Sequence, residues 1–220
     1  MSNLRAAEMM RKLTESGGPL DYGPDHSRLL LRVLRTLAKG HPVSTDQVER
    51  TIADLGIDRD EAQEFLREVA ERDAADKIVG ILGLSVNDHP HRFSVNGVRL
   101  SAWCAEDTLF LPAMLDQTAT VESESPLSKD TVRLTVSPDG VEDVSPAGAV
   151  VSMVIVDPDE ADMQAVEAIW GTFCHHIFFF ASRDEAERWA TGRDNIEILP
   201  VDEGYQLGKQ LWRKVIAYAA

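Results

Sequence analysis

The spacing of apolar residues changes near residue 78, and this change limits the folds available to the chain. Before that point, apolar residues recur three and four positions apart, as they do along one face of a helix. After it, short apolar and β-branched runs are separated by turn residues, a pattern typical of strands joined by hairpins. Because these strands do not alternate strictly with helices, the pattern predicts an α+β protein with antiparallel sheets and interspersed helices.

The first hundred residues predict three helices followed by a hairpin. Three helices are expected, over residues 27–39, 44–55 and 58–69. Ser44 with Gln47 three residues later is a capping-box signature for the second of them. Two strand-like runs follow, Ile78–Val86 and Arg92–Leu100, with Asn96-Gly97 as a hairpin turn. Three helices and then a hairpin predict a winged-helix-like module.

These patterns predict three parts of the chain. Residues 1–26 form an N-terminal extension with a short possible helix and several glycine and proline breaks. Residues 27–100 form the winged-helix-like module, and residues 101–220 form an α+β core that contains both cysteines.

The charge balance opposes the DNA-binding role that a winged helix often has. The formal net charge is −15, and residues 44–76 contain eleven acidic side chains against four basic ones. Phosphate contacts require Lys and Arg, so this surface would repel a nucleic acid and an anionic membrane alike. We therefore expect no nucleic-acid partner and no membrane partner.

Two further observations concern the compartment. No apolar run approaches the length of a membrane span, and the N-terminus lacks the basic-then-apolar pattern of a secretory signal. Two cysteines in 220 residues do not form a disulfide framework. The sequence thus predicts a cytoplasmic protein with two reduced thiols.

Cys104 lies near the centre of the chain with Asp107 three residues after it. We expect a strand that ends near Trp103, followed by a turn or short helix that carries both side chains. Residues three apart share a helix face, so the thiol and the carboxylate could reach one ligand together. Pro112 limits how far a regular helix can run before it kinks or stops.

Cys174 lies in an apolar stretch, Thr172–Phe180, which predicts a buried strand. For a cysteine among so many phenylalanines, a role as a small buried hydrophobe is the simplest interpretation. Three chemistries remain open for the two thiols. One is a zinc site with His175 and His176, although paired close spacings are lacking. The others are a cysteine nucleophile with a histidine base, and capture of a soft metal by two thiolates.

Two stretches surround the cysteines: Trp103-Cys104-Ala105-Glu106-Asp107-Thr108-Leu109 with Pro112, and Phe173-Cys174-His175-His176 followed by Phe179-Phe180-Ala181-Ser182. Two more are Val132 to Pro138 and Leu37-Ala38-Lys39-Gly40. Together these motifs resemble the alkylmercury lyases, the organomercurial lyases of bacterial mercury resistance, over roughly residues 27–215 and in the same order. Family members often carry a further cysteine directly after the second catalytic one, where this chain has His175.

The resemblance implies that Cys104, Asp107 and Cys174 form the catalytic trio and hold the mercury of substrate and product. The implied reaction is protonolysis of the carbon–mercury bond of R–Hg⁺ to a hydrocarbon and Hg²⁺, with two thiolates as ligands and the aspartate as proton donor. No organic cofactor is implied. The implied partners are organomercurial substrates, low-molecular-weight thiols, and a mercuric reductase as acceptor of Hg²⁺.

One alternative from another class stays open at this point. An acidic winged-helix regulator or sensor could bind a soft metal through the same two thiols without any chemistry. Release of a hydrocarbon from an organomercurial distinguishes the two.

Overall fold

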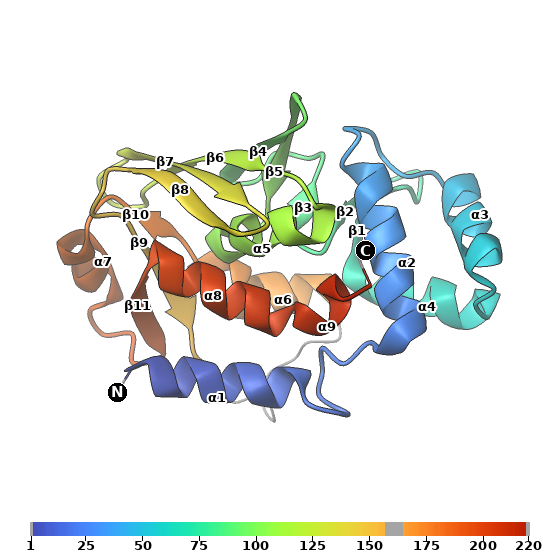
Figure 1. Cartoon of the computed structure of the whole chain (residues 1–220), viewed down its shortest axis with the longest axis horizontal. Coiled ribbons are helices and arrows are strands. Elements are labelled where there is room, and N and C mark those ends of the chain that lie inside the picture. Colours follow the sequence, from blue (N-terminus) through green and yellow to red (C-terminus); the bar gives the residue numbers. More distant parts are fainter. Residues whose placement is uncertain (1, 157–164, 219–220) are drawn as a thin grey trace.

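One helix, α5 (Ala105–Leu115), lies at the centre of the protein, between a large sheet and the helix α8 (Val201–Leu211) (Figure 1). In the computed structural model, which describes residues 2–156 and 165–218 with side chains from residue 8 on, every residue of α5 is buried. Apart from the polar residues of its first turn, α5 is apolar, so no face of it favours water and it folds as the centre of the core. Pro112 does not stop this helix, which continues to Leu115.

The large sheet has eight antiparallel strands in the spatial order β1-β2-β3-β5-β4-β6-β7-β8. Its strands are β1 (Ala70–Arg72), β2 (Ile78–Ile81), β3 (Leu84–Ser85), β4 (His91–Val95), β5 (Val98–Ala102), β6 (Ala119–Glu124), β7 (Thr131–Ser137) and β8 (Gly140–Ser145). The burial of β6 and β7 alternates along each strand, as expected when one face packs on the core. The predicted α+β class with antiparallel sheets is confirmed.

A smaller sheet completes the core on the other side of α5. Its order is β10-β9-β11, with β9 (Val150–Val154) between β10 (Phe179–Phe180) and β11 (Ile196–Pro200). All five residues of β9 are buried. A central strand covered on both faces is expected to be apolar throughout.

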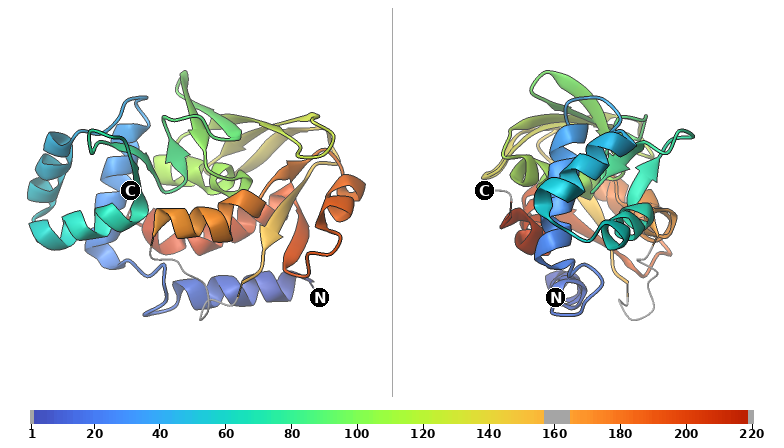
Figure 2. Two further views of the ribbon diagram at one scale, coloured as in Figure 1. Left: turned by 180° about the vertical axis from the view of Figure 1, so that it is seen from behind. Right: turned by 90° about the vertical axis from the view of Figure 1, so that its right-hand side faces the viewer.

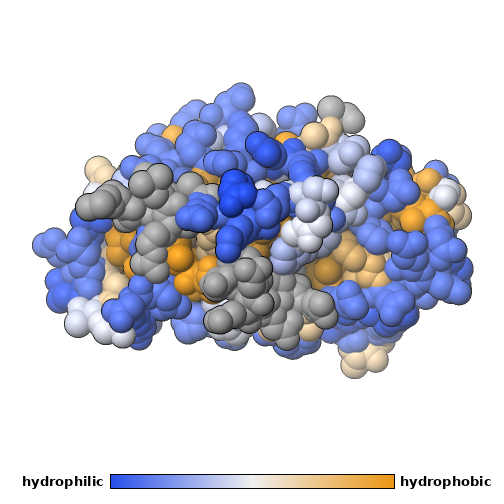
Figure 3. Space-filling view, turned by 90° about the horizontal axis from the view of Figure 1, so that it is seen from below, coloured by the Kyte–Doolittle hydropathy of each residue, from blue (hydrophilic) through white to orange (hydrophobic). Residues whose placement is uncertain are grey.

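The helices that pack on this core include α6 (Val166–Thr172), α7 (Arg183–Ala190), α8 and α9 (Arg213–Ile216). α8 runs along α5, and α1 (Ser2–Thr14) lies beyond α8 at the edge of the molecule farthest from the large sheet (Figures 1 and 2). Hydrophilic side chains cover most of the face on the side of α1, and apolar residues show only in places between them (Figure 3).

The N-terminal helices α2 (Gly23–Leu37), α3 (Thr45–Leu55) and α4 (Arg59–Val69) gather at one end (Figure 1). The capping box predicted at Ser44 is confirmed, because its hydroxyl accepts from the Gln47 amide. The strands that follow these helices join the eight-stranded sheet with the later strands. The winged-helix-like character of this part, and the division of the chain at residues 26 and 100, stay predictions.

Two predicted strands were wrong. Ile78–Val86 is two short strands, because Leu82 and Gly83 adopt positive φ and form a tight turn between them. Thr172–Phe180 is mostly not a strand: Cys174–His176 form the 3-10 helix η1, and only Phe179–Phe180 pair with β9. An apolar run indicates burial without fixing the backbone conformation: Cys174 and Ile177 are buried here although they lie in and next to a turn.

Two further observations complete the outline. The sequence Asp157-Pro158-Asp159 is typical of a helix start, but these residues lie outside the described part of the chain, where α6 begins at Val166. Within the described part of the chain, none of the helices has the length and apolar character that crossing a membrane requires.

Candidate active site

Cys104 is the N-cap residue of α5, and Asp107 caps the helix from inside its first turn. The Asp107 carboxylate accepts a hydrogen bond from the Cys104 backbone N–H at 2.8 Å. The Asp107 amide in turn faces the Cys104 sulfur, so the pair forms a capping box with a thiol in place of the usual hydroxyl. The three-residue spacing noted in the sequence is therefore the spacing of a helix cap.

Gly83 presses the backbone of the β2–β3 turn against the Asp107 carboxyl group. Its φ is +86°, and a Cβ added there would overlap the side chain of Asp107. The Gly83 carbonyl also accepts from the Trp103 amide at 2.9 Å. The turn thus contacts the Asp107 carboxyl group on one side and holds Trp103 on the other. Only glycine lets the backbone come this close to the carboxyl group.

Cys174 begins η1, and Phe173 is the single residue between it and α6. The end of this turn is joined to α5, because the Ala105 amide donates to the Ile177 carbonyl at 3.2 Å. Ser152 of β9 holds it from the other side, since its hydroxyl accepts from the Phe178 amide and donates to the His176 carbonyl, both at 2.9 Å. These backbone contacts bring a sulfur seventy residues away to the N-terminus of α5.

The structure brings the three predicted site residues together. One ligand atom from each of Cys104, Asp107 and Cys174 lies within 4.8 Å of the other two. Both cysteines are free and buried, with exposed fractions of 3% and 5%. Two soft sulfurs and one carboxylate oxygen can therefore contact a single metal atom.

Burial decides the ionisation of this cluster. Desolvation raises the pKa of Cys104 well above its ordinary value, with further contributions from its hydrogen bond to Cys174 and from the charge of Asp107. The hydrogen bond from Cys104 lowers the pKa of Cys174, but burial and the Asp107 charge outweigh it and leave that pKa raised. Both thiols are therefore protonated at neutral pH.

The carboxyl group of Asp107 has a pKa close to neutral pH. Burial raises its pKa to about 6, against the opposing effect of its hydrogen bonds with Cys104. Near neutral pH this group can both accept and give a proton, as a general acid or base must.

The four-ligand zinc set considered from the sequence does not form. His175 and His176 are exposed, and neither belongs to the cluster that holds Cys104 and Cys174. Because the segment is a 3-10 turn, the strand alternation that would have placed His176 beside Cys174 does not apply.

A cavity of about 110 Å³ adjoins the three site residues. Its walls come from distant parts of the chain and are mainly apolar, with Met9 and Met10 from α1, Phe110 from α5, and Phe173 before Cys174. Such a cavity admits an apolar group next to the sulfurs and keeps most water away from it.

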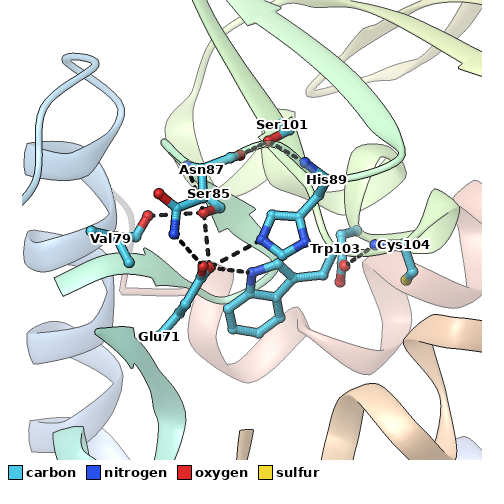
Figure 4. A network of polar contacts seen from close by, with 9 residues as sticks. Glu71, Val79, Ser85, Asn87, His89, Ser101, Trp103 and Cys104 are labelled. Atoms are coloured by element: carbon cyan, nitrogen blue, oxygen red, sulfur yellow. Dashed lines mark hydrogen bonds and ion pairs between the residues drawn. The ribbon is translucent and has the colours of Figure 1, made fainter. Parts of the chain in front are cut away.

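Glu71 of β1 supports the residue before the thiol. Its carboxylate accepts hydrogen bonds from four side chains around it, shown in Figure 4: Ser85 at 2.8 Å, Asn87 at 2.6 Å, Trp103 at 3.1 Å and His89 at 3.2 Å. Burial acts to raise the pKa of Glu71, but hydrogen bonds from His89, Asn87, Ser85 and Trp103 outweigh it and lower the pKa to about 2. Trp103 is thereby held as a wall of the cavity, with its ring edge-to-face against Trp170 at 5.5 Å.

Sequence reasoning did not find Glu71, Gly83 or Glu106. Glu71 stood among many acids of a charged helical region, with nothing to distinguish it. Gly83 carried a usable signal, because a glycine inside an apparent strand often marks a turn or a close backbone approach. Glu106 resembled the ordinary acidic residue of a helix first turn, yet it is buried in the cavity wall.

Comparisons with known proteins agree with this arrangement. The sequence pattern of the family described as alkylmercury lyase matches residues 84–213. The alkylmercury lyase of Staphylococcus epidermidis (strain ATCC 12228 / FDA PCI 1200) is 38% identical over 181 residues, which are 81% of this chain and 79% of that protein. The alkylmercury lyase of Streptomyces lividans is 40% identical over 214 residues, which are 94% and 92% of the two proteins.

A solved structure, the mercury-bound form of MerB2, has a TM-score of 0.74 to this protein and 24% sequence identity. It covers 97% of this chain, and this chain covers 99% of it. At that identity the comparison shows a shared fold.

Gly83→Ala should destabilise the protein by about 1–3 kcal/mol more than Gly97→Ala, because the new methyl group must displace the Asp107 carboxyl. Gly97 is the matched control: it also has a positive φ, but a Cβ there meets no atom within 4 Å. Urea unfolding of both variants measures the difference. Equal losses of free energy in the two variants would show that Gly83 does not press on Asp107.

Glu71→Gln should reduce stability at neutral pH, and the deficit should shrink as the pH falls. Folding lowers the pKa of Glu71 from 4.5 to about 2, so the ionised group stabilises the folded state above pH 4.5. That stabilisation is lost as the pH falls through 4.5 toward 2, where wild type and variant should converge. Urea unfolding across this range measures it, with Glu124→Gln at an exposed position of β6 as control; a deficit independent of pH would contradict the assignment.

Proposed function

Because this chain belongs to the alkylmercury lyase family, we propose that Cys104, Cys174 and Asp107 carry out the cleavage of a carbon–mercury bond. The observation that carries the proposal is the buried cluster of two sulfurs and one carboxylate within 4.8 Å. These residues are the matching positions of the family motif, and each supplies a group that the reaction needs.

Mercury is the metal that this donor set suits best. It is a soft ion that prefers thiolates, and two cysteine sulfurs can hold it with the carboxylate alongside. The structural relative with the same fold was solved in a mercury-bound form, which supports mercury as the ion. The substrate is an organomercurial, R–Hg⁺, delivered as its complex with a small thiol.

The first step exchanges thiols. One cysteine forms a sulfur–mercury bond, the bond from mercury to the carrier thiol breaks, and the carrier leaves with the cysteine's proton. The second cysteine then binds the same mercury and gives its proton to Asp107. Metal binding stabilises each thiolate, which offsets the raised pKa of both buried thiols.

The second step breaks the carbon–mercury bond. Two sulfur ligands donate electron density to mercury, so the electron pair of the carbon–mercury bond becomes more basic and takes the proton from Asp107. The hydrocarbon R–H leaves, Asp107 returns to its carboxylate form, and Hg²⁺ stays between Cys104 and Cys174. No electron is gained or lost overall, and a carboxyl group with a pKa of about 6 is suited to both halves of the proton transfer.

The apolar cavity assists by excluding water from the acid and from the developing charge on carbon. We further propose that low-molecular-weight thiols or a mercuric reductase remove the Hg²⁺, because only competing thiolates can displace it from two sulfurs. A reducing cytoplasm would keep both thiols free, as this chemistry requires.

Cys104→Ser and Cys174→Ser should each abolish release of benzene from phenylmercury, because a hydroxyl does not replace a thiolate as a ligand for mercury. Headspace gas chromatography measures the benzene, and circular dichroism checks that each variant remains folded. Turnover at the wild-type rate by either variant would refute the two-sulfur mechanism.

Asp107→Asn should still bind phenylmercury but release benzene at least about 100-fold more slowly, because general acids contribute rate factors of this size. The amide oxygen can keep the cap on the Cys104 N–H, so this variant separates proton donation from positioning. Asp116→Asn, at the exposed end of the same helix, is the matched control. Retained turnover in Asp107→Asn would remove Asp107 from the role of proton donor.

A further inference from the structure

Glu106 is a buried acid in the cavity wall that the proposed reaction does not use. Only 4% of its surface is exposed, and among the described residues neither carboxyl oxygen has a hydrogen-bond partner. Burying a polar group without a partner costs free energy, so such a group in a cavity wall indicates a ligand that can complete it.

The carboxyl group of Glu106 lies where α5 meets α8. A Cβ on Gly208 would overlap this carboxyl and would also contact Phe110, one turn farther along α5. Gly204, one turn earlier on α8, likewise has an oxygen of Glu106 at 3.5 Å from the position of a Cβ. Because Gly204 and Gly208 have no side chains, they leave room for the carboxyl group of Glu106.

A second polar group without a partner lies next to this space. Trp212 follows Gly208 by one helical turn, is 9% exposed, and has an indole N–H without a partner in the described part of the chain. Its ring lies against Phe110, with centroids 5.2 Å apart. Glu106 and Trp212 line the same cavity as Cys104, so both polar groups belong to the space in which the organic group of the substrate would lie.

The charges around the cavity limit what can bind there. Two acids, Glu106 and Asp107, line it. Among the described residues that line the cavity there is no Lys, Arg or His to pair with an anion. A cation would have to form an ion pair in an apolar enclosure, which is costly.

On the proposed function as its basis, we propose that Glu106 and Trp212 form a polar subsite that binds a neutral hydroxyl substituent on the organic group of the mercurial. A hydroxyl accepts a hydrogen bond from the indole N–H and donates one to the carboxyl oxygen. The cavity volume of about 110 Å³ is comparable to that of an engineered apolar cavity, about 150 Å³, that binds benzene. A hydroxyaryl group therefore matches both the apolar walls and the polar end.

The kinetic test compares 4-hydroxyphenylmercury with phenylmercury in wild type, Glu106→Gln and Glu106→Met. For each protein we divide kcat/KM for 4-hydroxyphenylmercury by kcat/KM for phenylmercury, which cancels effects common to both substrates. The ratio in Glu106→Met gives the intrinsic difference in reactivity between the two compounds. We expect the ratio to fall about tenfold in Glu106→Met, because a site loses discrimination when its hydrogen-bonding group is removed. Glu106→Gln should retain most of the wild-type ratio, because its amide can donate and accept.

An unchanged ratio in Glu106→Met would overturn the subsite. A higher kcat/KM for 4-(aminomethyl)phenylmercury, a cation, than for the hydroxyl compound would overturn its neutral character. Failure of wild type to release benzene from phenylmercury would instead refute the proposed function, which makes the two failures distinguishable.

A binding measurement on the wild-type chain needs neither turnover nor a Glu106 variant. The indole N–H resonance of Trp212, assigned through its loss in Trp212→Phe, should shift on addition of phenol and stay nearly unchanged on addition of benzene. A resonance that phenol leaves in place would overturn the subsite.

Discussion

The hydrogen bond from the Cys104 N–H to the Asp107 carboxylate is the contact on which the site depends. α5 is buried along its whole length, so water cannot satisfy the amides at its N-terminus, and a buried helix end needs partners from the chain. The cap supplies one, and the same two residues are the thiol and the acid of the proposed reaction. A single structural requirement of the central helix therefore places two reactive groups side by side.

The third group depends on contacts made by the backbone. The turn that carries Cys174 is held to α5 through Ile177 and to β9 through Ser152, and both contacts are independent of the cysteine side chain. The sulfur can therefore exchange its proton for a metal without loss of the contacts that position it. Burial keeps all three groups poorly solvated. This raises the pKa of each group and so favours its protonated form.

The local part of this arrangement could be predicted from sequence, and the rest could not. Cys104 and Asp107 are three residues apart, and a helix cap is a short-range feature that such spacing indicates. Cys174 could be placed there only through resemblance to a family, because its local structure was predicted wrongly and no local rule pairs residues seventy positions apart. Gly83 and Glu71 act through contacts between distant segments. A glycine inside an apparent strand indicates a close backbone approach, but no local rule identifies Asp107 as the partner of Gly83 or Trp103 as a partner of Glu71.

The role of the predicted N-terminal extension could not be predicted from the sequence either. From the sequence it was a short helix followed by glycine and proline breaks, with no evident task. In the structure Met9, Met10 and Leu13 of α1 line the cavity, together with residues from α5, α6 and α8. Asp107 must keep its proton until the carbon atom takes it, so it needs an enclosure that excludes water. The helix α5 cannot form that enclosure alone. Segments from both ends of the chain therefore close the space around chemistry located at its middle.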